Sequence, residues 1–122
     1  MIQNLILVAL GGAIGSVARF LTVTAVGRLA PGWPWGTWGV NVAGSFAMGV
    51  LFVALGPRPH WSPLLMAGVL GGFTTFSAFS LDALKLWQGG QPLQGLAYVA
   101  ASVVFSLIAV ALGAALARGA LA

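Results

Sequence analysis

The chain reads Gly71-Gly72-Phe73-Thr74-Thr75-Phe76-Ser77-Ala78-Phe79-Ser80 within a long apolar segment. Two adjacent glycines weaken a helix, because glycine loses the most backbone freedom on folding. Hydroxyl groups in hydrocarbon need hydrogen-bond partners. Non-helical backbone at membrane depth persists only where protein surrounds it or where it lines a watery or ion-filled path. The stretch therefore predicts a helix broken near its middle, and it is the first candidate for a conduction or binding site.

The composition around this stretch is that of an integral membrane protein. Of the 122 residues, 60% are hydrophobic and 5% are charged, which is more apolar than a soluble domain needs to be. Asp82 is the one acidic residue, and the five basic residues are scattered along the sequence. The clustered basic surface of a nucleic-acid-binding protein is therefore not predicted. The chain has no cysteine, which excludes disulfides and thiolate chemistry. The bases are Arg19, Arg28, Arg58, Lys85 and Arg118.

Four segments are long and apolar enough to cross a bilayer, which takes about 20 residues of helix. We expect an all-α fold with spans at about 4–26, 35–55, 63–86 and 93–116, forming a single transmembrane domain over residues 1–122. Glycine and proline, the usual helix breakers, separate the segments. The tryptophans lie near the expected span ends, as in an interfacial aromatic belt.

The charges give this arrangement little preference for one orientation in the membrane. Arg58 and Arg118 lie on one expected side, and Arg28 and Lys85 lie on the other, with Arg19 inside the first span. Because orientation follows the difference in Lys and Arg between the two sides, we expect insertion in both directions. Two oppositely inserted copies then form an antiparallel homodimer with its two-fold axis in the membrane plane.

Three of the expected helices each carry a narrow polar or aromatic stripe at helical spacing. Serine and threonine in such stripes also bond to their own helix carbonyls or hold membrane helices together, so a structural role stays open. For Asn41, whose amide has donors and acceptors to satisfy, function and interhelical bonding are equally open. The stripes are Thr37, Asn41 and Ser45, then Tyr98, Ser102 and Ser106, then Phe76, Phe79 and Asp82 with Thr75, Ser77 and Ser80 around them.

The groups in these stripes favour a small anion that forms strong hydrogen bonds. Apart from Asp82 they are uncharged: hydroxyls, one amide, and backbone N–H groups at the expected break. Phenylalanine rings have a positive edge that can face an anion without offering a full charge. A path without a fixed positive ligand binds an anion weakly enough to release it.

The chain resembles the Fluc (CrcB) family of small fluoride channels along nearly its whole length. The family motif GGxxGAxxRY is similar to Gly11-Gly12-Ala13-Ile14-Gly15-Ser16-Val17-Ala18-Arg19-Phe20. The motif GTxxxNxxGSF is similar to Gly36-Thr37-Trp38-Gly39-Val40-Asn41-Val42-Ala43-Gly44-Ser45-Phe46. The motif GGxTTFSTFS is similar to residues 71–80 and is the most specific of the three.

The resemblance implies an antiparallel dual-topology dimer with two fluoride pores in the bacterial cytoplasmic membrane, exporting cytoplasmic fluoride passively. It implies that the rings of Phe76 and Phe79 border the fluoride path and that the Asn41 amide lines it. It implies that Arg19 lends positive potential to a vestibule. The other candidate pore residues are Thr37, Thr75, Ser77, Ser80, Tyr98, Ser102 and Ser106.

The resemblance also implies a structural sodium ion at the dimer centre, bound by the backbone carbonyls of Gly71 and Thr74 from both subunits. The expected partners are thus fluoride, sodium, membrane lipid and a second copy of the chain. Two positions depart from the family pattern: Ala78 replaces a threonine, and Asp82 replaces a glutamate. Asp82 is interpreted either as a group at the pore end or as an i, i+3 partner of Lys85.

Other function classes fit the residues less well. An enzyme is not predicted, because one acid and His60 in a loop form no acid–base pair or metal cluster. The alternative is a small dual-topology multidrug or cation exporter, which needs a carboxylate buried in a span. Asp82 lies near a span end, which counts against that alternative. A non-transporting assembly subunit is a further hypothesis, in which changes at Phe76 or Asn41 leave ion flux unchanged.

Overall fold

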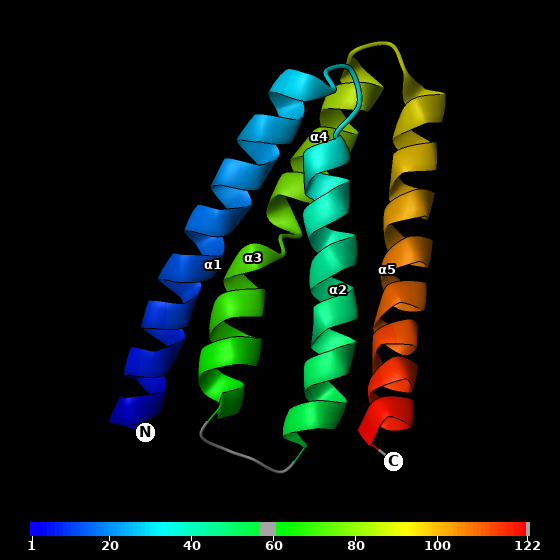
Figure 1. Ribbon diagram of the computed structural model, residues 1–122. Helices are drawn as coiled ribbons and strands as arrows, with labels where there is room; N and C mark the ends of the chain where they lie inside the picture. Colours follow the sequence, from blue (N-terminus) through cyan, green and yellow to red (C-terminus); the bar gives the residue numbers. More distant parts are fainter. Residues whose placement is uncertain (57–60, 122) are drawn as a thin grey trace.

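The computed structural model describes residues 1–56 and 61–121, and Arg58 and His60 lie outside these ranges. The described chain is helical, as expected, and contains four segments long and apolar enough to span a membrane: Ile2–Leu29, Trp35–Leu55, Pro63–Gln88 and Pro92–Leu121. The elements are α1 (Ile2–Leu29), α2 (Trp35–Leu55), η1 (Pro63–Leu70), α3 (Gly71–Phe73), α4 (Ser77–Gln88) and α5 (Pro92–Leu121). Figure 1 shows that α1 begins at the same end of the bundle where α5 finishes.

The helix ends follow local sequence signals. Helix α2 has the bounds expected for the second span, whereas α1 and α5 extend beyond their expected spans at both ends. Helix α5 starts at Pro92, where the missing N–H of proline costs nothing because that group has no helical partner. Gly32 after α1 and Gly90 after α4 have φ angles of 101° and 81°, which glycine adopts without steric cost.

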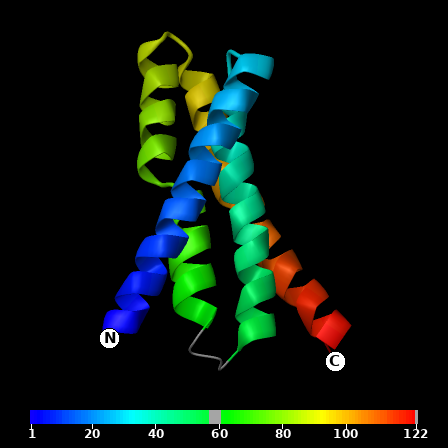
Figure 2. The ribbon, with the colours of Figure 1, turned by 60° about the vertical axis from the view of Figure 1, so that its left-hand side comes forward.

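Small residues let two pairs of helices approach closely. Helix α1 packs against η1 and α3, and α2 packs mainly against α5. A methyl group added at Gly15 would meet the carbonyl of Val69, and one added at Gly49 would meet that of Val110. Gly68 lies equally close to the backbone of Gly11. This is the close packing expected of small residues four positions apart in lipid. Figure 2 shows α1 running obliquely across the bundle.

The third span is interrupted where the glycine pair and hydroxyls predict it. It runs through η1 and α3 to Phe73, becomes extended at Thr74 (φ −88°, ψ 158°), and resumes as α4 at Ser77. Helix α4 is displaced sideways from the line of η1 and α3 (Figures 1 and 2). The sequence analysis did not predict that η1 is a π-helix, a form that often occurs at functional sites.

The most deeply buried side chains lie between α4, α5 and the start of α2. Tyr98 is fully buried and packs with Phe79 and Leu86, with Trp33 and Trp38 against them. Many large apolar side chains on α1 and α5 point outward, for example Leu10, Phe20 and Leu107. Such an apolar exterior suits helices surrounded by lipid.

Candidate functional site

A cavity of about 570 Å³ lies beside the break in the third span. It is bounded by α2, α5 and the residues on both sides of the break. No charged side chain lines it among the residues that the structure describes. Its polar groups are therefore hydroxyls, one amide and backbone groups. The lining residues are Asn41, Gly44, Ser45, Met48, Gly71, Thr74, Thr75, Phe76, Phe79, Ser102, Val103, Ser106, Leu107 and Val110.

Asn41 holds the break from α2. Its Nδ2 donates to the carbonyl of Thr75 at 2.9 Å, and its Oδ1 accepts from the backbone N–H of Thr75 at 2.7 Å. The side-chain amide thus replaces helical partners that Thr75 loses when the backbone leaves the helix. An asparagine NH₂ group has two donors, so one N–H of Asn41 is left for another acceptor at the cavity.

The break redirects the N–H groups that would normally bond to Gly71 and Thr74. In a continuous helix Thr75 N–H would donate to Gly71, but it donates to Asn41 instead. The N–H of Ala78 would donate to Thr74, but it donates to the Thr75 hydroxyl at 3.1 Å. The carbonyls of Gly71 and Thr74 therefore lose their usual donors, and both residues line the cavity. Carbonyl oxygens freed by unwound helix suit an alkali cation.

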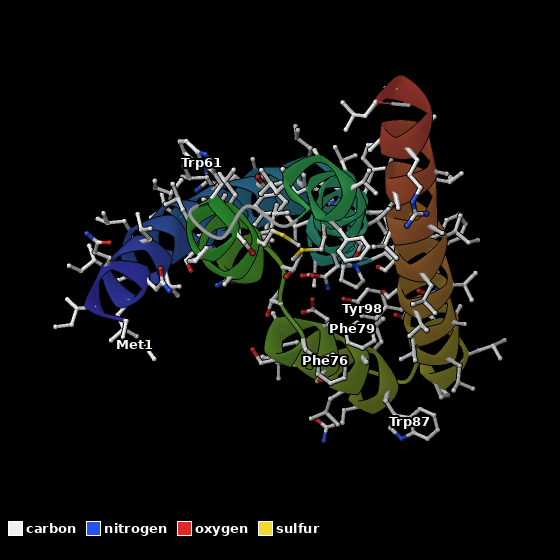
Figure 3. All side chains as sticks on the ribbon, turned by 90° about the horizontal axis from the view of Figure 1, so that it is seen from below. Met1, Trp61, Phe76, Phe79, Trp87 and Tyr98 are labelled. Atoms are coloured by element: carbon white, nitrogen blue, oxygen red, sulfur yellow. The ribbon has the colours of Figure 1, made fainter. Side chains whose placement is uncertain are left out.

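Aromatic rings form a continuous row from the cavity into the core. The ring centroids of Phe76 and Phe79 are 5.5 Å apart, and those of Phe79 and Tyr98 are 5.2 Å apart. Figure 3 shows Phe79 and Tyr98 beside each other between α4 and α5. Phe76 is 78% exposed in the single chain, whereas Phe79 is 8% exposed. Phe76 thus presents a large apolar ring at the open side of the cavity.

Ser102 brings a buried polar atom without a partner to the same cavity. The residue is 5% exposed, and its Oγ atom has no hydrogen-bond partner among the described residues. A buried hydroxyl without a partner is costly. Because Ser102 lines the cavity, a ligand or water there would satisfy it.

Beyond Tyr98 lies a second, smaller hollow. The Tyr98 hydroxyl points to Asp82 Oδ2 at 3.5 Å, longer than the usual length of about 2.5–3.0 Å for an O–H···O hydrogen bond, so this contact is weak. Asp82 and Lys85 both line this hollow of about 370 Å³, together with the turn after α1. No ion pair joins Asp82 to Lys85 in the part of the chain that the structure describes. Tyr98 thus provides a weak side-chain contact to this carboxylate.

Comparison with known proteins places this chain in a family. The family model described as "CrcB-like protein, Camphor Resistance (CrcB)" matches residues 6–114. The chain belongs to the CrcB family. A relative from Paracoccus denitrificans named "Fluoride-specific ion channel FluC" is 53% identical over 114 residues, covering 92% of each chain. One of the same name from Chelativorans sp. is 57% identical over 120 residues, covering 94% of this chain and 96% of the relative. The resemblance that the motifs indicated is confirmed.

In this member of the CrcB family, the structure brings many of the predicted site residues to one cavity. They are Asn41, Thr75, Phe76, Phe79, Ser102 and Ser106, together with Gly71 and Thr74. Thr37 and Tyr98 lie outside the lining, with exposures of 3% and 0%. Ser80 donates to its own helix at the carbonyl of Phe76, and Ser77 lies 3.4 Å from the Thr75 hydroxyl. Local hydrogen bonding of this kind is the structural alternative that the sequence left open.

Several lining residues were not among the sequence-based candidates because they are apolar or small. Gly44 and Met48 belong to the same face of α2 as Asn41, and Val103, Leu107 and Val110 accompany Ser102 and Ser106 on α5. Extending each polar stripe by one helical turn would have found Met48 and Val110. The sequence also carries no signal for the hydrogen bond that Arg19 Nε donates to the carbonyl of Gly72 at 3.1 Å.

Proposed function

We propose that this chain forms a fluoride-specific ion channel, in which the cavity beside the broken third span is part of the fluoride path. The observation that carries the proposal is the chemistry of the lining: uncharged hydroxyls, an amide and two phenylalanine rings, together with a buried Ser102 hydroxyl that has no partner among the described residues. The printed names of the relatives support the choice of fluoride.

The cavity residues would act by replacing the water around a small anion. The free N–H of Asn41 and the hydroxyls of Ser102 and Ser106 are suitable donors. The edges of Phe76 and Phe79 add weak positive potential. Because the lining offers no fixed positive charge, binding stays weak enough for the ion to leave. Thr37, Thr75, Ser77, Ser80 and Tyr98 would support these groups or extend the path.

We propose that the functional unit is an antiparallel dimer with two such paths. In the single chain the cavity is open, and the exposed ring of Phe76 stands at that open side. A second copy inserted in the opposite direction would cover this side. Arg19 would lend positive potential to the approach, and Asp82, which contacts Tyr98, would stand at the far end of the path.

The carbonyls of Gly71 and Thr74 fit the structural sodium ion that the family implies. Both have lost their helical donors, and uncharged carbonyl oxygens are ligands that an alkali cation accepts. When bound, sodium would supply positive charge that offsets the partial negative charges of the carbonyl oxygens where the two copies meet. The residues present are therefore compatible with a cation at the dimer centre.

We expect passive export of fluoride across the cytoplasmic membrane of a bacterial cell. Passive flow of fluoride needs a compensating flow of charge, whereas electroneutral exchange does not, and this difference separates the two. Purified protein in potassium fluoride-loaded liposomes is monitored with a fluoride electrode. A channel releases fluoride rapidly only when a potassium ionophore compensates the charge. Release without the ionophore would indicate electroneutral transport of fluoride coupled to protons. Absence of release in both conditions would reject fluoride transport and favour the alternative, a small multidrug or cation exporter.

A further inference from the structure

We propose that Arg19 is a positioning residue that fixes the broken third span, in addition to any effect of its charge. Its Nε donates to the backbone carbonyl of Gly72 at 3.1 Å, across 53 positions of sequence. Gly72 lies next to Gly71, whose carbonyl is one of the proposed sodium ligands. The inference rests on the proposed function and assigns Arg19 a role in setting the geometry of those carbonyls.

The close contact between α1 and the third span delivers Arg19 to this carbonyl. A methyl group added at Gly72 would lie 2.7 Å from the carbonyl oxygen of Gly12. A methyl group added at Gly15 would also collide with the backbone of Val69 and Phe73. Arg19 follows Gly12 and Gly15 on the same helical face. The guanidinium therefore reaches the break because glycines leave no side chain between the two backbones.

The carbonyl of Gly72 is available because the helix stops. In a continuous helix it would accept from the N–H of Phe76, but the backbone is extended at Thr74 between them. A hydrogen bond from a charged donor to such a carbonyl is stronger than one from a neutral donor. Asp82, the acidic residue of the chain, is on α4 and contacts Tyr98. The partner of Arg19 Nε is instead a backbone carbonyl.

Arg19 and Asn41 together hold the break from two helices. Arg19 on α1 binds Gly72, and Asn41 on α2 binds Thr75 on both of its backbone groups. Gly72 adjoins Gly71, and Thr75 adjoins Thr74. Releasing the Arg19 contact should therefore loosen the carbonyls that would hold sodium.

A role in positioning and a role as a charge have opposite consequences for sodium. If Arg19 acted only through charge, neutralising it would remove repulsion of a nearby cation and tighten sodium binding. If Arg19 positions the carbonyls, removing its Nε would weaken sodium binding. The variants Arg19→Met and Arg19→Lys separate these cases. Both place a carbon where the Nε donor stands, and only lysine keeps the charge.

The measurement is the sodium concentration that gives half of the maximal thermal stabilisation of the purified dimer, with N-methylglucamine replacing sodium. We expect Arg19→Met to raise this concentration about tenfold, as for loss of one hydrogen bond from a charged donor. Arg19→Lys should raise it as well. The control Arg28→Met, in the last turn of α1, should leave it unchanged.

An unchanged or lower sodium midpoint in Arg19→Met would overturn the inference. If Arg19→Met yields no folded protein, Arg19→Lys decides: a raised midpoint supports positioning, and a wild-type midpoint overturns it. Fluoride release by the wild-type protein is measured in parallel. Its absence would refute the proposed function, whereas wild-type release with an unchanged Arg19→Met midpoint would refute the inference alone.

Discussion

The side chain of Asn41 bonds to both backbone groups of Thr75, donating to its carbonyl at 2.9 Å and accepting from its N–H at 2.7 Å. Through these bonds a residue on α2 satisfies the backbone at the point where the third span leaves the helix. The same amide keeps one N–H for the cavity. Asn41 thus supports the break and leaves a donor available at the cavity.

Replacing Asn41 with alanine should abolish fluoride release. The change leaves the N–H and carbonyl of Thr75 unpaired, at a cost of about 1–3 kcal/mol for each group. It also removes the donor that faces the cavity. Fluoride release from liposomes and gel filtration of the purified protein measure the two effects. The control Asn4→Ala, exposed near the start of α1, should behave like wild type, and wild-type release by Asn41→Ala would refute this role.

Replacing Phe76 with isoleucine should stop fluoride release without unfolding the chain. The ring is 78% exposed, so its loss removes little packing within one subunit, whereas the positive ring edge is lost from the proposed path. Release is measured with the electrode and folding by circular dichroism. Phe20, which is 65% exposed on α1, gives the matched control Phe20→Ile, which should release fluoride normally. Equal release by both variants would argue for a role of Phe76 outside the path.

Replacing Ser102 with alanine should separate stability from transport. Its buried hydroxyl has no partner among the described residues, so removing it should leave the thermal unfolding midpoint unchanged or raise it. Fluoride release should fall about tenfold if the hydroxyl donates to the ion. Thr22, whose hydroxyl bonds to its own helix at Ala18, provides the control Thr22→Ala. A stable Ser102→Ala protein with full release would show that this hydroxyl does not contact fluoride.

A reporter fused to the C-terminus should be active on both sides of the membrane. Arg28 and Lys85 lie in the last turns of α1 and α4, at one end of the bundle, and Arg118 lies in the last turn of α5, at the other. This balance gives no strong orientation. Paired alkaline phosphatase and fluorescent protein fusions measure the two orientations. Activity on one side alone would exclude an antiparallel dimer.

The sequence predicted the helices and the break well because both depend on local properties. Apolar length defines the spans, and the pair Gly71-Gly72 followed by hydroxyl residues marks the interruption. Helical spacing placed Asn41 on one polar stripe and Ser102 and Ser106 on another, and the structure brings all three to the lining of one cavity.

What the sequence did not predict depends on how the helices are placed relative to one another. The bond from Arg19 to Gly72 exists because glycines bring α1 against the third span. Thr37 shares a helical face with Asn41 but is 3% exposed and lies outside the cavity lining. Its neighbour Trp38 packs against the buried cluster of Phe79, Leu86 and Tyr98 at that end of α2. Spacing identifies a shared face, but only the packing of neighbouring helices decides which residues on it reach an open space.

An uncharged, hydrogen-bonding cavity at the broken helix should pass fluoride and exclude larger anions. Liposomes loaded with equal fluoride and chloride test this selectivity, with potassium ionophore added and both anions monitored by selective electrodes. We expect rapid, complete fluoride release while chloride stays inside. Chloride leaving together with fluoride, or fluoride retained as in protein-free liposomes, would refute the proposed channel.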